Sequence, residues 1–300
     1  MKKFWFFIIV VIGLLLISYS ISGLFWIEDF GDKIAVIPIK GTITGEGSED
    51  LFISGSTSSA TITKWIKQAN SDDSVKGIIL EINSPGGTVV ASEEISNEIK
   101  RTDKPVVALI REVGASGAYW IATNSDKIVA DPLSITGSIG VTSSYLEFSG
   151  LMEYYGVNYE RLVAGRYKDA GSPFRELTPE ERRLLQNKLD IVHEAFIDEV
   201  SKNRNLKREE VKKMADGFFY FGKEAKELGL IDELGDKELA INITKELAGI
   251  EEADLITYEE KTRLIDLLSR ISAHSFYFIG RGIGKELFSL EQANNFRFIT

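Results

Sequence analysis

Two short segments of the chain carry residue types that together could hydrolyse a peptide bond. Ser116 stands among small residues (113–120), directly after an apolar run at 106–110 that is typical of a strand. Its hydroxyl is therefore expected at the tip of a strand, where a helix begins. Further along, Lys168 lies in a segment flanked by glycines, 165–173. A lysine held out of water is one of the few side chains able to take a proton from serine at neutral pH, so the pair predicts a Ser/Lys hydrolase.

The composition removes the commoner alternatives to a lysine base. The chain contains no cysteine and two histidines, which excludes thiol catalysis, cysteine-bound zinc, iron–sulfur clusters and disulfides. A Ser-His-Asp triad would have to use His193, inside a long helical pattern, or His274 near the C-terminus. We expect no cofactor and no catalytic metal. The net charge of −10 argues against nucleic acid as a partner, because phosphate binding requires a basic surface.

Hydrolysis of an amide by a serine also needs hydrogen-bond donors for the oxyanion that forms on the substrate carbonyl. Residues 83–87 follow a strand-like run and open a helix, and glycines there let backbone N–H groups approach a ligand without interference from a Cβ atom. We expect Gly86 and Gly87 to be oxyanion donors, with the N–H of Gly117 as the second arm. A plain strand-to-helix turn would use the same glycines, so that alternative stays open. Ser138 is a rival nucleophile or a helper that steadies the lysine.

The N-terminal segment 4–27 has no charged side chain and follows Lys2 and Lys3. It is long enough to span a bilayer as a helix, and the aromatic residues near both of its ends suit the two membrane interfaces. We expect an uncleaved anchor, and a cleaved secretory signal is the competing interpretation. The two lysines should stay in the cytoplasm, which predicts a single-pass protein of the cell membrane with its catalytic domain on the outer face.

The rest of the chain alternates strand-like runs with helical patterns, which predicts an α/β architecture with a largely parallel sheet. Strands are expected at 33–39, 77–82, 106–110 and 127–130, and helices at 62–69, 89–100, 118–122, 178–203, 207–214, 222–229 and 236–247. The predicted division is a membrane anchor at 1–28, a catalytic domain at 29–250 and a C-terminal extension at 251–300. That extension could serve assembly or lie near the membrane.

The motifs, taken in order, resemble those of the signal peptide peptidases of the SppA type, which are membrane-anchored Ser/Lys proteases that degrade cleaved signal peptides. The matching segments are 83–87, 115–120, 136–141, 167–173 and 227–235. The resemblance implies that Ser116 is the nucleophile and Lys168 the general base, with Gly86 and Gly117 shaping the oxyanion hole. One position departs from the family pattern, because Ala118 stands where family members often have a second glycine after the serine.

The same resemblance implies a fold and an assembly. The fold would be similar to Clp protease and crotonase, with repeated strand-strand-helix units, and the chains would form rings whose active sites face an enclosed space. This chain carries one copy of the repeat, which implies a homo-oligomer completed by identical subunits. Whether Lys168 meets Ser116 of its own chain or of a neighbour stays open. The implied substrates are signal peptide remnants and other membrane-associated peptides.

Three alternatives compete with this interpretation. A crotonase-like enzyme acting on a CoA thioester would use the same Gly-Gly turn but would need acidic catalytic residues and a cytoplasmic chain. The membrane-linked, stomatin-cleaving Ser/Lys proteases share the fold, but their usual extra transmembrane segments are not visible in this sequence. A catalytically inactive scaffold that assembles at the membrane would not need to keep both Ser116 and Lys168.

Overall fold

The computed structural model describes residues 12–13, 31–46 and 56–259. The anchor expected at 4–27 therefore lies outside the described residues except for Ile12 and Gly13, and so does most of the extension expected at 251–300. No helix within the described ranges has both the length and the apolar character needed to cross a membrane. The described residues up to Tyr258 belong to one compact unit, to which the following account refers.

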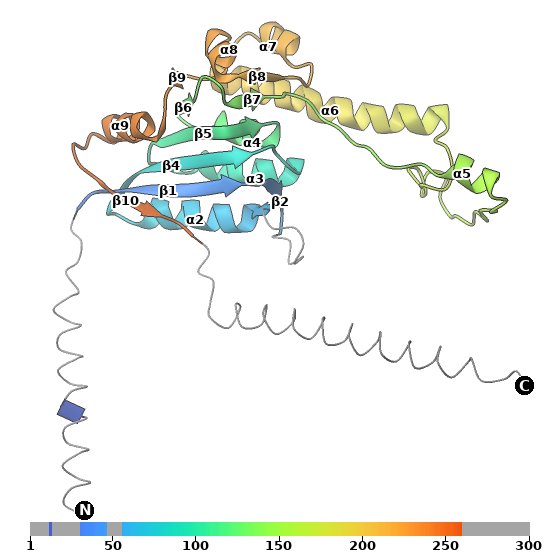
Figure 1. Cartoon of the computed structure of the whole chain (residues 1–300), viewed down its shortest axis with the longest axis horizontal. Helices are drawn as coiled ribbons and strands as arrows, with labels where there is room; N and C mark the ends of the chain where they lie inside the picture. Colours follow the sequence, from blue (N-terminus) through green and yellow to red (C-terminus); the bar gives the residue numbers. More distant parts are fainter. Residues whose placement is uncertain (1–11, 14–30, 47–55, 260–300) are drawn as a thin grey trace, which may run out of the picture. The chain divides into compact units, whose positions relative to one another are not determined.

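The core of this unit is a mainly parallel sheet, which confirms the predicted α/β class (Figure 1). Its main path has the order β10-β1-β4-β5-β6-β9, with every neighbouring pair parallel. The bounds are β1 Lys33–Lys40, β4 Val75–Ser84, β5 Val106–Ala115, β6 Lys127–Ala130, β9 Glu233–Leu234 and β10 Asp254–Thr257. β10 pairs with β1, so the sheet continues beyond residue 250, where the catalytic domain was expected to end.

Four strands of three residues each were not predicted. β7 (Ile135–Gly137) pairs in parallel with the end of β5, and β8 (Phe219–Phe221) pairs antiparallel with β7. β2 (Thr42–Thr44) and β3 (Ser56–Ser58) form a separate parallel pair. Strands of three residues carry too little hydrophobic alternation to be seen in a sequence, but β7 fixes the backbone that leads into Ser116.

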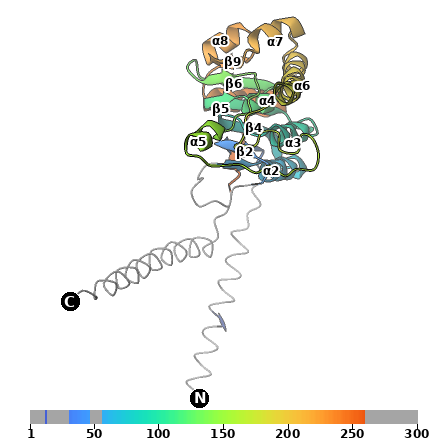
Figure 2. The same cartoon turned by 90° about the vertical axis from the view of Figure 1, so that its right-hand side faces the viewer.

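Helices cover both faces of the sheet. Alternate residues of β1 point to opposite faces, so that Ile37 and Ile39 pack in one hydrophobic cluster and Ile34 and Val36 in another. The first face carries α2 (Ser59–Ser71), α3 (Val89–Ile99) and α4 (Gly117–Ala122), with α2 and α3 on the same side of the strands (Figure 2). The second face carries α9 (Lys237–Ala248).

The long helix α6 (Pro179–Arg204) joins the sheet unit to a more exposed region. It begins with the predicted capping box, in which Thr178 Oγ1 accepts a bond from the Glu181 N–H and the Glu181 carboxylate accepts one from the Thr178 N–H. Near its C-terminal end, Phe196 and Val200 are buried in the main hydrophobic cluster. We call residues 143–178, which precede α6 and contain α5 (Ser149–Tyr154), the arm. The remaining helices are α7 (Arg208–Met214) and α8 (Gly222–Glu227).

Candidate active site

Ser116 occupies a strained turn between a strand and a helix. It follows the last residue of β5 and precedes the first residue of α4, with φ 52° and ψ −125°. Its N–H donates to the Gly137 carbonyl over 2.8 Å, and its own carbonyl accepts from the Trp120 N–H over 2.9 Å. A positive φ at a residue other than glycine is uncommon and tends to occur at functional sites. The turn therefore presents a half-buried hydroxyl at the tip of a strand, as the sequence predicts.

The glycine turn predicted to hold the oxyanion lies against Ser116. A Cβ atom on Gly86, which has φ 103°, would lie 2.7 Å from the Gly117 nitrogen and 3.0 Å from the Ser116 Cβ. A Cβ atom on Gly117 would lie 3.3 Å from the Gly87 nitrogen. The fold thus brings Gly86, Gly87, Gly117 and Ser116 together, and a side chain on Gly86 would fill the space beside the serine.

The three glycine N–H groups differ in their hydrogen bonds. The Gly86 N–H donates to the Ser84 hydroxyl over 3.1 Å. Within the described residues, neither the Gly87 nor the Gly117 N–H has a backbone or side-chain acceptor. Gly117 is the first residue of α4, where an N–H has no partner inside the helix and where the helix dipole favours negative charge. The two N–H groups open to a ligand are therefore those of Gly87 and Gly117.

Ser116 borders a cavity of about 440 Å³ between the sheet end, α3 and α6. Ser138, the second predicted serine, lines the same cavity, also with a positive φ of 50°, and donates its hydroxyl to the Gly217 carbonyl over 3.0 Å. The apolar part of the lining is contributed by Val89, Trp120, Val141, Val192 and Phe196. The Trp120 and Phe196 rings are in contact, with centroids 4.9 Å apart. The cavity is suited to an apolar side chain beside a reactive hydroxyl.

Sequence reasoning missed several of these lining residues. Ser92 and Val89 lie on α3, and Phe196 lies far along the chain on α6. Their apolar or small side chains follow ordinary helical patterns, so the sequence contains no signal that separates cavity walls from core. Ser92 Oγ would lie 2.4 Å from a Cβ on Gly117, which places it directly behind the oxyanion turn.

Lys168 is not part of this cavity. The described residues that line it include Thr142 and Val192, and none comes from the arm. Lys168 is exposed in the segment that runs from α5 back to the start of α6, and Figure 1 shows α5 well beyond the carboxyl end of β5. The structure of one chain therefore assembles Ser116, Ser138 and the three glycines, and it does not bring Lys168 to them.

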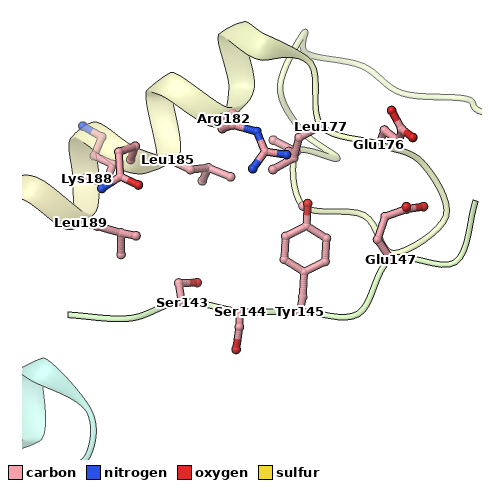
Figure 3. Close-up of a pocket in the computed structure, with 13 residues that line it drawn as sticks. Ser143, Ser144, Tyr145, Glu147, Glu176, Leu177, Arg182, Leu185, Lys188 and Leu189 are labelled. Carbon is pink, nitrogen blue, oxygen red and sulfur yellow. The ribbon is translucent and has the colours of Figure 1, made fainter. Parts of the chain in front are cut away.

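A second cavity, of about 860 Å³, lies between the start of the arm and α6 (Figure 3). Tyr145 points across it toward Arg182, and Ser143 points toward Leu189. Its lining begins one residue after Thr142, which lines the cavity beside Ser116. The two cavities thus follow each other along the extended segment that leaves Ser138. Within the described part of the chain, no group of three or more side chains is placed to hold a metal ion.

Comparison with protein families identifies the chain. The profile of Peptidase family S49 matches residues 98–251, which is more than half of the chain and includes Ser116 and Lys168. The chain belongs to peptidase family S49. A second profile, that of the NfeD1b N-terminal domain, matches residues 33–146. Membership of S49 makes the chain a serine protease, which confirms the predicted enzyme class and the resemblance to the SppA type.

Individual S49 relatives agree with this assignment. A protein of Methanocaldococcus jannaschii named as a protease is 40% identical over 227 residues, covering 74% of this chain and 72% of its own length. A protein of Enterococcus faecium named signal peptide peptidase SppA is 36% identical over 233 residues, covering 77% and 68%. The chloroplastic serine protease SPPA of Arabidopsis thaliana is 34% identical over 250 residues, covering 81% of this chain and 37% of its own length.

Proposed function

We propose that this S49 protease is a membrane-anchored endopeptidase in which Ser116 and Lys168 act as a dyad, in a homo-oligomer with a Clp-like fold of repeated strand-strand-helix units. The observation that carries the proposal is the strained turn at Ser116, which borders a cavity next to two N–H groups without acceptors among the described residues. These are the parts that acyl transfer requires on the nucleophile's side.

In the proposed reaction, the Ser116 oxygen attacks the scissile carbonyl while the Lys168 amine takes the hydroxyl proton. The N–H groups of Gly87 and Gly117 then stabilise the oxyanion. Lys168 returns the proton to the leaving amine, and an acyl-enzyme remains on Ser116. A water molecule, deprotonated by Lys168, releases the acid and restores the serine. Gly86, whose N–H donates to Ser84, supports the turn in this scheme, and Ser138 steadies the incoming amine.

The base is the part that one chain does not supply to its own cavity, so we propose that Lys168 reaches Ser116 of a second copy. A lysine can act as a base when it is withdrawn from water, and Lys168 is exposed in the single chain. Closure of a neighbouring subunit over it would supply both the burial and the serine. For the question that the sequence leaves open, we therefore propose a shared site.

The arm offers a surface for such an assembly. Its exposed apolar side chains are Tyr145, Leu146, Phe148, Leu151, Tyr154, Tyr155, Val157, Tyr159, Leu162, Val163, Tyr167 and Phe174. Leu162 is 95% exposed and Tyr154 81%. Soluble proteins rarely leave so many large apolar groups uncovered in one region, and such surfaces mark interaction sites. A ring of identical subunits would cover them.

We further propose that the substrate is an extended peptide with apolar side chains. In the part of the chain that the structure describes, the backbone of residues 139–147 makes no backbone hydrogen bond, so an added strand could pair with it. The apolar walls of the neighbouring cavity would receive a side chain next to the scissile bond. Signal peptide remnants fit this description, and the name of the Enterococcus faecium relative agrees with it.

Residues 4–27 are proposed as the anchor that holds the enzyme at the membrane, with the N-terminus in the cytoplasm and the catalytic domain on the outer face. The support is the uncharged apolar composition of the segment and the two lysines before it. Extraction of membranes at alkaline pH would leave the full chain in the pellet, while a chain lacking residues 1–28 would be released. Release of the full chain would contradict the anchor.

The dyad is tested by acylation and by complementation. Mass spectrometry after fluorophosphonate treatment should find the label on Ser116 of the wild type and strongly reduced labelling in Lys168→Met. Co-expression of Ser116→Ala with Lys168→Met should then restore peptide cleavage, because some sites would receive Ser116 from one copy and Lys168 from another. Two variants that stay inactive together would place the dyad within one chain.

The alternatives make different predictions in the same experiment. An inactive scaffold would assemble but would not be labelled. A crotonase-like enzyme would not be labelled at Ser116 either, and it would need an acidic residue in the cavity, whereas none of the described lining residues is acidic. Labelling at Ser138 in place of Ser116 would exchange the roles of the two serines.

A further inference from the structure

The turn that carries Lys168 is tied to the first turn of α6 on both sides of the lysine. On one side, the Tyr167 hydroxyl donates to Glu180 over 2.5 Å, and Arg166 also pairs with Glu180 while lying over the Tyr167 ring. On the other side, Asp169 is linked to Glu181 through Arg175. The neighbours of Lys168 in the chain thus contact two consecutive residues of one helix, while much of the surrounding arm is exposed.

Arg175 is the centre of the second link. Its Nε and Nη2 donate to the two carboxylate oxygens of Asp169 over 2.9 and 3.0 Å. Its Nη1 and Nη2 donate to the two oxygens of Glu181 over 2.9 and 2.6 Å. Arg161 adds two bonds of 2.7 Å to Asp169 from the far side. The planar fork of a guanidinium allows this double pairing, which the single ammonium group of a lysine cannot reproduce.

These groups are withdrawn from solvent although they lie in the arm. The exposed fractions of the side chains are 4% for Glu181, 12% for Asp169 and 19% for Arg175. The bonds from Arg161 and Arg175 hold the pKa of the Asp169 carboxyl well below its usual range. Arg175 together with the Thr178 N–H lowers the pKa of Glu181 to about 2. Both carboxylates are therefore charged and paired at neutral pH.

The pairing leaves Lys168 itself free. Among the described residues, Lys168 forms no ion pair with a carboxylate, and the adjacent Asp169 has its carboxylate oxygens occupied by two arginines. The network thus holds the backbone on both sides of the lysine and keeps the Asp169 carboxylate paired with the two arginines.

We propose that Arg175 is a positioning residue of the active site: by bridging Asp169 and Glu181 it fixes the Lys168 turn on α6 so that the amine can be presented to the serine of a neighbouring subunit. This inference rests on the proposed Ser116/Lys168 dyad. A displacement of about 1 Å at a catalytic group can cost on the order of 100-fold in rate, so a loose turn should be costly even with Lys168 intact.

The test measures the rate of fluorophosphonate labelling at Ser116 in the full-length, detergent-solubilised protein. Arg175→Ala should lower that rate by about 100-fold without changing the size of the assembly or its melting temperature. Millimolar guanidinium should restore much of the rate, because the free cation can occupy the gap between the two carboxylates. A role in overall stability alone would not respond to guanidinium.

Two further variants complete the design. Arg208 bridges Asp198 and Glu194 at the junction of α6 and α7, away from the arm, so Arg208→Ala is a matched control that should label at the wild-type rate. Asp169→Asn removes the paired charge with little change of shape and should slow labelling. If Arg175→Ala does not fold, the labelling rate of Asp169→Asn tests the positioning role in its place.

The outcomes separate this inference from the proposed function. Unlabelled wild type, or full labelling of Lys168→Met, would overturn the dyad itself. A labelled wild type, an unlabelled Lys168→Met and an Arg175→Ala that labels at the wild-type rate would overturn the positioning role alone. Loss of assembly in both Arg175→Ala and Asp169→Asn would also overturn it, because the network would then hold the protein together and not only the turn.

Discussion

The segment around Ser116 and the segment around Lys168 are held in place by different kinds of interaction. Ser116 sits at the end of a buried strand, its φ and ψ angles held by β7 and α4, with the apolar core directly behind it. Lys168 sits in the arm, which exposes most of its apolar side chains and is held by ion pairs to α6. The nucleophile is positioned by packing, and the proposed base by charge.

Two halves of a shared site can thus be held in place by different interactions. A strained backbone persists only where the surroundings over-determine it, as at the end of β5. A surface that contacts another subunit has to stay uncovered in the single chain. Before assembly it is therefore held by local ion pairs and hydrogen bonds and not by burial in a core.

The largest effect is expected from the two proposed catalytic side chains. Ser116→Ala and Lys168→Met should each reduce peptide cleavage by on the order of 10⁴-fold, and the double variant should lose little more, because residues that act as one unit are not additive. Steady-state cleavage of a fluorogenic peptide measures this. Substantial remaining activity in Ser116→Ala, or additive losses, would show that the two residues do not act together.

The next largest effect is expected from glycine substitutions, which should lower activity more beside Ser116 than in the arm. Gly86→Ala combines a positive φ with a Cβ 2.7 Å from the Gly117 nitrogen, so it must distort the oxyanion turn. We expect activity to fall by about 100-fold or more. Gly156 in the arm also has a positive φ, 68°, but nothing lies within 4 Å of an added Cβ.

Gly156→Ala should therefore cost only backbone strain, about 1 kcal/mol, and leave most of the activity. Chemical denaturation and peptide cleavage, measured on both variants, give the comparison. Equal losses of activity would mean that close packing around Ser116 is not what makes its turn sensitive.

A charge on the arm should act through assembly. Leu162→Glu places a carboxylate on the most exposed apolar side chain of the arm, so we expect smaller particles in analytical ultracentrifugation and a loss of cleavage that grows on dilution. The matched control is Leu133→Glu, since Leu133 is 76% exposed outside the arm. If both variants assemble like the wild type, the arm is not the contact between subunits.

The smallest effect is a dependence of the arm on pH. The pKa of Glu181 is lowered from 4.5 to about 2 by Arg175, and that of Asp169 is also lowered. Carboxylates with a depressed pKa in the folded state stabilise it above their ordinary pKa and lose that contribution as the pH falls through the folded value. The arm should therefore loosen between about pH 4.5 and pH 2.

Hydrogen exchange, corrected for its intrinsic dependence on pH, can follow this loosening. Amides of residues 166–181 should lose protection as acid is added, while those of β4 and β5 keep theirs. In Glu181→Gln the arm should exchange faster at neutral pH and respond less to acid. Protection that is independent of pH in the wild type would contradict the ionic account of the arm.

Much of the fold could be predicted from the sequence. The strand at 127–130, the helix opened by Thr178 and Glu181, and the parallel sheet all follow from local patterns of apolar residues, caps and turns. β7 and β8 could not be predicted, because a strand of three residues has no periodicity to detect. β7 forms because β5 extends to Ala115, beyond its apolar stretch, and its last residues pair with β7; β8 then pairs with β7.

Part of the candidate site could be predicted too. Ser116, Gly86, Gly87 and Gly117 meet because each follows a neighbouring parallel strand, and the carboxyl ends of such strands share one edge of the sheet. The cavity walls contributed by α6 could not be predicted. Phe196 obeys the same helical pattern as any core residue, and only its contact with Trp120 makes it part of the cavity.

Short-range interactions along the chain are enough to specify the alternation of strands and helices, the glycine turns and the caps, and the sequence also names the residue types able to carry out acyl transfer. Which of these groups meet in space depends on the tertiary structure. It joined Ser138 to the cavity of Ser116, packed Phe196 against Trp120, and left Lys168 on an exposed arm. These outcomes depend on the packing of segments far apart in the chain, which no local pattern encodes.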